Sequence, residues 1–298
     1  MTTASNEPPR SLAIGAADRI AIIAGSGRLP QDIVEGLLSA GHRPIVAAIE
    51  GEAEFSEAPD RYDLLRVPAR RLGLLMPELK RHGVTHLVLA GGVAARPPIR
   101  SLRVHPRFLL HLPRLLTAYA RGDDALLRML VGYVEANGIR VVGAHELVPE
   151  LLAPEGLLSK AKPTRGDEKD IAAALAAARA IGRLDIGQAA IAIGGRAVAL
   201  EGIEGTDGLL ARTKELRSHG RLAGKGRGVL VKCTKPGQEA RADLPTIGPQ
   251  TVTAAHGAGL AGIAVEAEVS FILACAETVN LADRHGLFIL GFARGREQ

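Results

Sequence analysis

The sequence predicts an α/β protein with an N-terminal Rossmann-like parallel-sheet domain and a C-terminal mixed α/β domain. Three observations support this prediction. Aliphatic runs that favour strands alternate with amphipathic helical stretches along the chain. Aromatic residues make up only 3% of the sequence, whereas 35 glycines recur at short intervals, as in proteins with many tight turns between strands and helices. The 298 residues are also enough chain for two domains with cores of their own.

The first half of the chain begins with a β-α-β pattern. An aliphatic run that starts at Arg19 ends in a glycine turn, a helix follows over residues 31–41, and a second strand covers residues 45–50. This spacing favours two parallel strands joined by a right-handed crossover. The pattern continues with strands over 62–67, 85–93 and 139–147 and with helices over 72–83 and 122–138. We therefore expect a Rossmann-like domain at residues 19–148, preceded by a flexible tail at residues 1–18.

The second half starts after a Pro- and Leu-containing connector, which we expect to be a linker at residues 149–164. A strong helix is predicted over 167–182, and two alternating strands around Gly194 and Gly195 predict a hairpin over 188–203. The remaining pattern consists of a helix from 206, a strand over 228–233, a helix over 251–259, a strand over 262–268, and a helix and strand over 277–291. It predicts a catalytic α/β domain at residues 165–298.

Composition and motif content exclude several classes of protein. The chain has too few aromatic residues for a base-stacking platform, so no nucleic-acid partner is expected, and its net charge is only +5. No run of about 18 apolar residues could span a membrane, and the N-terminus lacks a secretory signal, so we expect a cytoplasmic protein. The metalloprotease, serine-hydrolase and P-loop motifs are all missing. Cys233 and Cys275 are expected to be buried, reduced thiols, and no histidine is assigned a role.

Glycine pairs follow two of the predicted strands. Gly25, Ser26 and Gly27 end the first strand, and Gly91 and Gly92 end a later one. Backbone N–H groups in such turns can bind an anion, and two of these strand ends predict a ligand between them. A plain turn is the alternative. The first turn has a proline where a dinucleotide fingerprint has its third glycine, although Glu50 stands where nicotinamide enzymes hold the ribose, so an oxidoreductase stays open.

Acidic and basic residues gather at several further turns. Asp123 and Asp124 begin a predicted helix, where capping explains one of them and a sugar or metal contact is an alternative for the other. In the second half the cluster comprises Glu201, Glu204, Asp207, Lys232, Lys235, Asp243 and Thr246. Carboxylates suit Mg²⁺, and Lys or Arg can neutralise phosphate charge. A solvated loop charge or a helix cap remains the alternative for each residue alone.

Several stretches together resemble a known family. They are IAIIAGSGRLP, RGDDALLR, VVGAHE, IGRLDIGQAAI, LEGIEGTDGLLAR, KPGQEARADLPTIGPQTV, AGLAGIAVEA and GLFILG. The chain is similar, from about Arg19 to Ala293, to the bacterial UDP-2,3-diacylglucosamine diphosphatases of lipid A biosynthesis, the type unrelated to metallophosphoesterases. The resemblance implies hydrolysis of the pyrophosphate of UDP-2,3-diacylglucosamine to UMP and 2,3-diacylglucosamine 1-phosphate (lipid X), assisted by Mg²⁺, with the substrate between the two domains.

The resemblance also implies roles for individual residues. Asp243 corresponds to the essential Asp of the DLPTIG motif, and we expect it to hold Mg²⁺ and the attacking water together with Glu204 or Asp207. Lys232 and Thr246 complete the expected catalytic set. The expected substrate-binding residues are Gly25, Ser26, Gly27, Gly91, Gly92, Asp123, Asp124, Glu204, Gly205 and Thr206, and the expected metal ligands are Asp243 and Asp207.

A diacylated sugar nucleotide has consequences for the partners of the protein. Its acyl chains need an apolar groove, and its home is a membrane surface, so we expect peripheral contact with the cytoplasmic face of the inner membrane. The basic, Leu-rich segment at residues 100–121 is a candidate for this contact, and an ordinary helix pair is the alternative. A homodimer is left open. A protein that binds the sugar nucleotide without cleaving it is a further alternative function.

Overall fold

A computed structural model of the chain describes residues 12, 14–15, 17–93, 123–222 and 226–293. The chain divides into two compact units. The first comprises Met1–Pro149 together with the short segment Glu239–Asp243, and the second comprises Glu150–Gln238 and Leu244–Gln298. Much of the expected tail, at 1–11, 13 and 16, and all of the basic segment at 100–121 lie outside the described residues.

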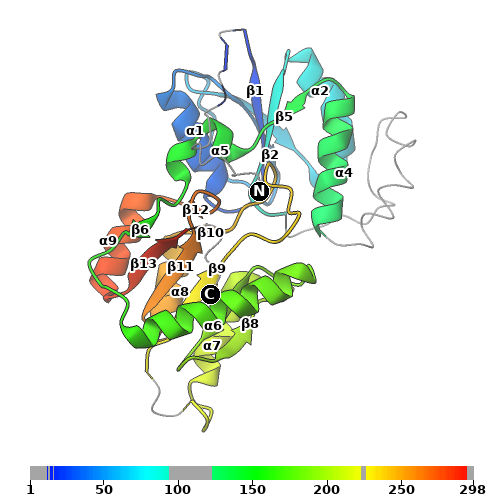
Figure 1. The fold of residues 1–298 in the computed structure, drawn as a ribbon. Helices are drawn as coiled ribbons and strands as arrows, with labels where there is room; N and C mark the ends of the chain where they lie inside the picture. The colour runs from blue at the N-terminus through cyan, green and yellow to red at the C-terminus, as the bar shows by residue number, and fades with distance from the viewer. Residues whose placement is uncertain (1–11, 13, 16, 94–122, 223–225, 294–298) are drawn as a thin grey trace, which may run out of the picture. The chain divides into compact units, whose positions relative to one another are not determined.

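The described part of the first unit is built on a parallel sheet (Figure 1). Its strands are β1 (Ile20–Ala24), β2 (Ile45–Ile49), β3 (Asp63–Val67), β4 (His86–Ala90) and β5 (Arg140–Val141). They lie in the order β3-β2-β1-β4-β5, and each neighbouring pair is parallel. The chain therefore runs to one side of β1 first and then to the other, which is the order of a doubly wound Rossmann-like sheet.

Helices cover both faces of this sheet (Figure 1). Helix α1 (Leu29–Ser39) packs with the short α5 (Ala144–Leu147) on one face. The opposite face is covered by the 3-10 helix η1 (Ala69–Leu74), α2 (Leu75–Arg81) and α4 (Asp123–Ala136). Leu79 of α2 and Val131 of α4 belong to one buried cluster with alternate side chains of the strands, because side chains of a strand alternate between its two faces.

The described part of the second unit has a mixed sheet in the order β6-β13-β11-β9-β7-β8. Its strands are β6 (Gly156–Leu157), β7 (Ala189–Ala192), β8 (Ala197–Leu200), β9 (Val229–Lys232), β11 (Gly262–Glu266) and β13 (Phe288–Phe292). Strands β9, β11 and β13 are parallel to one another, whereas β6, β7 and β8 pair antiparallel with their neighbours. A separate parallel pair consists of β10 (Thr246–Ile247) and β12 (Phe271–Ile272).

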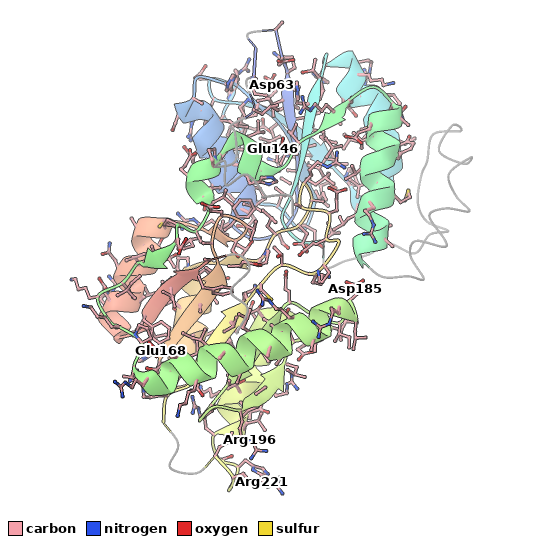
Figure 2. All side chains as sticks on the ribbon, viewed as in Figure 1. Asp63, Glu146, Glu168, Asp185, Arg196 and Arg221 are labelled. Atoms are coloured by element: carbon pink, nitrogen blue, oxygen red, sulfur yellow. The ribbon has the colours of Figure 1, made fainter. Side chains whose placement is uncertain are left out.

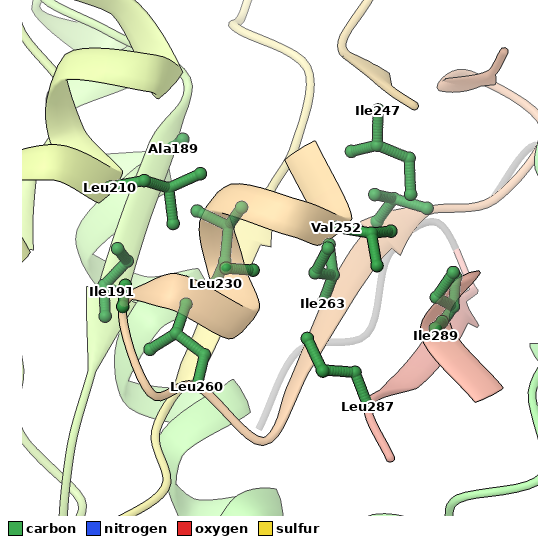
Figure 3. Close-up of a cluster of buried hydrophobic side chains, with 14 of the residues drawn as sticks. Ala189, Ile191, Leu210, Leu230, Ile247, Val252, Leu260, Ile263, Leu287 and Ile289 are labelled. Atoms are coloured by element: carbon green, nitrogen blue, oxygen red, sulfur yellow. The ribbon is translucent and has the colours of Figure 1, made fainter. Parts of the chain in front are cut away.

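The helices of this unit again divide between the two faces of its sheet. The long α6 (Arg165–Arg183) packs on one face through Ile171, Ala174 and Leu175. Helices α7 (Gly205–Leu216), α8 (Pro249–Gly257) and α9 (Cys275–His285) pack on the other face. Figure 3 shows the apolar cluster there, in which Leu210 of α7 and Val252 of α8 meet strand residues such as Ile263. The second unit thus has a core on each face of its sheet.

The predicted fold class is confirmed, and so is the hairpin. Gly194 and Gly195 both have positive φ, at 65° and 77°, and the N–H of Ile193 bonds to the carbonyl of Arg196. Two consecutive residues with positive φ define the type I′ turn that suits the twist of a hairpin, and glycine adopts that conformation without strain. Strands β7 and β8 are therefore joined as the sequence predicts.

The structure differs from the sequence-based expectations at several elements. The strand expected over 139–147 ends at Val141, because the N–H of Gly143 bonds to the Glu146 carboxylate at 2.7 Å and the chain turns into α5. The short strands β6, β10 and β12 were not expected, and β6 lies within the expected linker at 149–164. The expectation for Cys275 is wrong, because this thiol is exposed at the start of α9. The domain boundaries stay predictions.

Candidate functional site

The two predicted glycine turns meet at the carboxyl edge of the sheet in the first unit. Ser26 donates its N–H to the carbonyl of Gly92 at 2.7 Å, and Gly92 donates its N–H to the carbonyl of Ser26 at 3.0 Å. The Ser26 hydroxyl also donates to the Gly92 carbonyl, at 3.1 Å. These reciprocal hydrogen bonds join the end of β1 to the end of β4. The structure therefore brings together Gly25, Ser26, Gly27, Gly91 and Gly92, and the ligand expected between the two strand ends stays a prediction.

This contact requires glycine at two positions. A Cβ atom added to Gly25 would lie 2.1 Å from the carbonyl oxygen of Gly92. Gly91 has a φ of 85°, and a Cβ atom there would lie 2.5 Å from the carbonyl oxygen of Ser26. Both distances are far below any real contact of a Cβ atom. The glycines are thus needed for the close approach of two backbones as well as for the turns themselves.

The paired turns lie where the order of the strands reverses. Strand β1 has β2 on one side and β4 on the other, and the chain crosses in opposite directions to reach them. In open α/β sheets ligands bind outside the carboxyl ends of the strands at this switch point. Helix α1 starts at Leu29, directly after the first turn. Its first backbone N–H groups have no partners within the helix and favour an anion there.

The segment Glu239–Asp243, which carries the predicted catalytic carboxylate, packs on the first unit. Arg241 fixes it there: its Nη1 atom contacts the Glu135 carboxylate of α4 at 2.7 Å, and its Nε atom donates to Glu239 at 2.8 Å. Ala242 packs against the buried cluster beneath α4. Asp243 itself is partly buried, and its N–H bonds to the carbonyl of Glu239 at 3.1 Å. The polypeptide that leads to Asp243 in this segment is thus tied down.

Arg241 and Glu239, the ion pair that holds this segment, favour each other's charged form. Hydrogen bonds from Arg241 lower the pKa of the Glu239 carboxyl group, although partial burial opposes this shift. The same hydrogen bonds raise the pKa of the Arg241 guanidinium above its already high value. Both members are therefore ionised at neutral pH, and the charge-assisted contacts that hold the segment persist across the physiological range.

The same segment passes the carboxyl end of β5. A Cβ atom added to Gly143, just after β5, would lie 3.3 Å from the Cα atom of Arg241. The carboxyl ends of β1, β4 and β5 share one edge because the strands are parallel. The turns that carry the predicted anion-binding glycines and the segment that carries Asp243 therefore lie along the same edge of the first unit.

Within the second unit, Lys232 and Thr246 are brought together. Lys232 is only 5% exposed, at the carboxyl end of β9, and its Nζ atom donates to the backbone carbonyl of Thr246 at 2.8 Å. The Thr246 hydroxyl donates to the carbonyl of Leu244 at 2.9 Å. The ammonium group thus holds the turn that directly follows Asp243 in the sequence.

The EGTD stretch has a defined hydrogen-bond pattern at the start of α7. Thr206 donates its hydroxyl to the buried Glu201 carboxylate at 2.6 Å, and Glu201 also accepts the N–H of Gln188 at 2.7 Å. Glu204 forms an ion pair with Arg212 at 2.6 Å. Gly205 has a φ of 69°, and Asp207 lies in the first turn of the helix.

The donor chemistry of the predicted metal ligands fits Mg²⁺. Asp243 and Asp207 offer carboxylate oxygens, and Mg²⁺ is held in many enzymes by one or two carboxylates together with substrate phosphates. Among the described residues no group of three or more His, Cys, Asp or Glu side chains is arranged to hold a metal ion. Helix α4 begins at Asp123, and the side chains of Asp123 and Asp124 lie outside what the structure describes.

Glu266 and His145, which both have buried polar atoms, were not singled out from the sequence. Glu266, at the carboxyl end of β11, is 5% exposed and accepts the N–H and the hydroxyl of Thr234 at 3.0 and 2.7 Å. His145 of α5 has a buried Nδ1 atom with no hydrogen-bond partner among the described residues. A signal for Glu266 is its position as an acid ending an otherwise apolar strand. His145 lies in the stretch VVGAHE, but its approach to the backbone of Arg241 could not be recognised from the sequence, because the two residues are distant along the chain.

Comparisons with known proteins decide the family. A model of the LpxI N-terminal domain matches residues 19–151, and a model of the LpxI C-terminal domain matches residues 154–290. The chain belongs to the LpxI family. It is 39% identical over 274 residues to a Caulobacter vibrioides protein described as UDP-2,3-diacylglucosamine pyrophosphatase LpxI. That match covers 92% of this chain and 97% of the relative. The resemblance drawn from the sequence motifs is thereby confirmed. The paired turns and the Glu239–Asp243 segment are therefore features of an LpxI-family protein.

Proposed function

We propose that this protein hydrolyses the pyrophosphate bond of UDP-2,3-diacylglucosamine to UMP and lipid X. The observation that carries this proposal is the match of both LpxI domains in order along the chain, with nearly the whole length of a relative of that described activity covered. The geometry of the first unit supports it, because the paired turns lie at the switch point of the sheet and the N-terminus of α1, where anions are favoured, directly follows the first turn.

The reaction assigns simple tasks to the side chains. The oxygen of a water molecule forms a bond to one phosphorus, the bond from that phosphorus to the bridging oxygen breaks, and the bridging oxygen leaves with the other phosphate. Asp243 orients the water and accepts its proton. The N–H groups of Gly25, Ser26 and Gly92 donate to backbone carbonyls and hold the turns together. In this proposal the N–H groups of Gly27 and Gly91 neutralise charge on phosphate oxygens, in a geometry fixed before the substrate arrives.

The remaining predicted residues have supporting tasks in this proposal. Lys232 holds the carbonyl of Thr246, so it positions the turn after Asp243 while its charge favours the anionic substrate. Thr206, Gly205 and Glu204 form the start of α7, where Glu201 fixes the Thr206 hydroxyl and helix N–H groups face an anionic ligand.

We propose Mg²⁺ as the cofactor, with Asp243 as a carboxylate ligand; the role of Asp207, which belongs to the second unit, stays an expectation from the sequence. When bound, the ion would withdraw charge from the phosphate oxygens. Chelation with EDTA is expected to abolish hydrolysis, and added Mg²⁺ to restore it. Unchanged turnover in EDTA would refute the need for a metal.

The function is tested by release of UMP from UDP-2,3-diacylglucosamine with the purified full-length protein. Wild-type protein is expected to release UMP, and Asp243→Ala and Asp243→Asn are expected to lose at least about a hundredfold in kcat because the acceptor for the water proton is gone. Asp60→Asn, an exposed acid of the first unit, is the matched control and is expected to keep wild-type turnover. Binding of the substrate without cleavage would indicate a sugar-nucleotide-binding protein, and binding of NAD(H) at the Gly25–Gly27 turn would indicate an oxidoreductase.

A lipid substrate also implies where the protein works. We propose that it is cytoplasmic and contacts the cytoplasmic face of the inner membrane peripherally. No helix of the described residues is both long and apolar enough to cross a membrane. Co-flotation with vesicles of anionic phospholipid, weakened by high salt, is the expected result, and absence of binding at low salt would refute it. A homodimer is tested by the mass of the protein in light scattering.

A further inference from the structure

His145 lies on α5, just after the carboxyl end of β5, and the proposed mechanism does not use it. Its helix, α5, starts two residues after β5 and packs against both α1 and β4. Helix α1 follows the first glycine turn, and β4 precedes the second one. Helix α5 therefore contacts an element from each side of the switch point, at the carboxyl edge of the sheet.

The ring of His145 lies against the backbone near the segment that carries Asp243. A Cβ atom added to Gly143 would lie 2.3 Å from the Cε1 atom of His145 and 3.3 Å from the Cα atom of Arg241. The imidazole and the backbone of Arg241 thus approach the same point. Gly143 has to be glycine for both to do so, and Asp243 is two residues further along this segment.

The surroundings of the ring select its charge and its tautomer. Burial lowers the pKa of His145, although the carboxylate of Glu146 opposes the shift, so the ring is neutral at pH 7. Glu146, labelled in Figure 2, accepts the N–H of Gly143 with its carboxylate, and Arg241 pairs with Glu135 and Glu239. Nδ1 is buried and has no partner in the part of the chain that the structure describes, so a proton there would be a buried donor without an acceptor among those residues. We therefore assign the proton to Nε2.

A half-buried ring whose Nδ1 atom is enclosed leaves Nε2 as the nitrogen open to a ligand. We propose that the Nε2–H group of His145 donates a hydrogen bond to a phosphate oxygen of the nucleotide part of the ligand, next to the paired glycine turns. The choice of a nucleotide phosphate rests on the proposed function. His145 is then a further binding residue, from the motif VVGAHE, and adds a directed side-chain donor to the backbone N–H groups of the turns.

Calorimetric titration of the full-length protein with UMP tests this. His145→Ala is expected to weaken UMP binding about tenfold, the effect of losing one hydrogen bond to a charged group. His145→Gln is expected to bind nearly as wild type, because the glutamine amide can take the place of Nε2–H. Uridine, which has no phosphate, is expected to bind wild-type protein and His145→Ala equally. His82→Ala, an exposed histidine of the same unit, is the matched control and should bind UMP as wild type does.

Three results would overturn the proposal: UMP binding unchanged in His145→Ala, an equal loss for UMP and uridine, or a His145→Gln variant as weak as the alanine variant. If His145→Ala does not fold, His145→Gln is compared with His145→Asn, whose amide takes the place of Nδ1, and equal UMP affinities would refute the role of Nε2. The titration is independent of turnover. A wild-type protein that binds UMP in this pattern but releases none from UDP-2,3-diacylglucosamine would contradict the proposed function alone.

Discussion

Two buried carboxyl groups of the second unit, those of Asp167 and Asp170, have pKa values that are shifted in different ways. Asp167 is 1% exposed and accepts two hydrogen bonds from Arg227 and two from Thr164 at the start of α6. Burial opposes its ionisation, but these hydrogen bonds outweigh burial and lower its pKa below the ordinary 3.8. Asp170, one turn further along, has its pKa raised, chiefly by burial. Two acids of one helix therefore shift in opposite directions.

The lowered pKa of Asp167 makes a prediction about stability and pH. A carboxyl group with a depressed folded-state pKa contributes its full stabilisation above its unfolded pKa, and loses it as the pH falls through the folded pKa. The difference in unfolding free energy between wild type and Asp167→Asn is thus expected to be largest above about pH 5 and to narrow below 3.8. Urea unfolding at pH 7, 5 and 3 measures it. A difference that stays constant over this range would contradict the assignment.

Glu266 gives a second prediction at this scale. Glu266→Ala removes the acceptor for the N–H and the hydroxyl of Thr234 and is expected to lower the unfolding free energy by about 1–3 kcal/mol. Glu266→Gln keeps an oxygen acceptor of similar size and is expected to cost less. Urea unfolding at pH 7 compares the two variants, and equal losses would show that the negative charge of the carboxylate is needed, and that an oxygen acceptor in a side chain of the same size is not enough.

Among the elements, those with strong periodicity or clear turn chemistry were predictable. The βαβ start, the hairpin at Gly194 and Gly195, and helix α6 follow directly from local sequence. The short strands β10 and β12 are two residues each, too short for a period to be recognised. Helix α5 depends on one carboxylate, Glu146, that caps its first turn. Because this single contact is hard to recognise in the sequence, the strand predicted before α5 was made too long.

The contact between the paired glycine turns can be tested by a substitution at Gly25. Gly25→Ala would place a methyl group 2.1 Å from the Gly92 carbonyl oxygen, so the two turns must separate. We expect a loss of about 1–3 kcal/mol in unfolding free energy and a loss of UMP binding, measured by urea unfolding and calorimetry.

Gly132→Ala is the control for this substitution. Gly132 lies exposed within α4, and a Cβ atom there would meet nothing within 4 Å. Alanine has the higher helix propensity, so this variant is expected to be more stable by about 1 kcal/mol and to bind UMP normally. A Gly25→Ala variant that behaves like the control would show that the two turns are not held together in solution.

At the scale of the whole molecule, the anchoring of Asp243 on the first unit could not be predicted from the sequence alone. The motif DLPTIG marks Asp243, but the sequence groups it with the second half of the chain. Its position on the first unit depends on Arg241 contacting Glu135, 106 residues away, and on Ala242 packing in a distant core. No local pattern encodes such a pairing.

The contacts of Arg241 that hold the Asp243 segment are expected to affect activity more than stability. Arg241→Lys keeps a positive charge but cannot contact two carboxylates with a planar fork, so Asp243 is expected to be held less precisely. We expect kcat to fall about tenfold or more, while the urea midpoint changes little. Arg61→Lys is the matched control, because Arg61 contacts both oxygens of Glu35 in an exposed pair. Equal kcat in both variants would show that the anchor does not position Asp243.

The first unit is made of two stretches that are distant in the sequence, and this has a consequence during protein synthesis. A ribosome delivers the chain from the N-terminus, so the strands and helices up to Pro149 emerge well before the segment Glu239–Asp243 that completes this unit. A nascent chain that has reached Pro149 can pair its sheet, but the carboxyl edge, where we propose that the ligand binds, lacks its last segment until more than half of the remaining polypeptide has been added. This edge of the first unit is thus finished late, after much of the second unit has already been made.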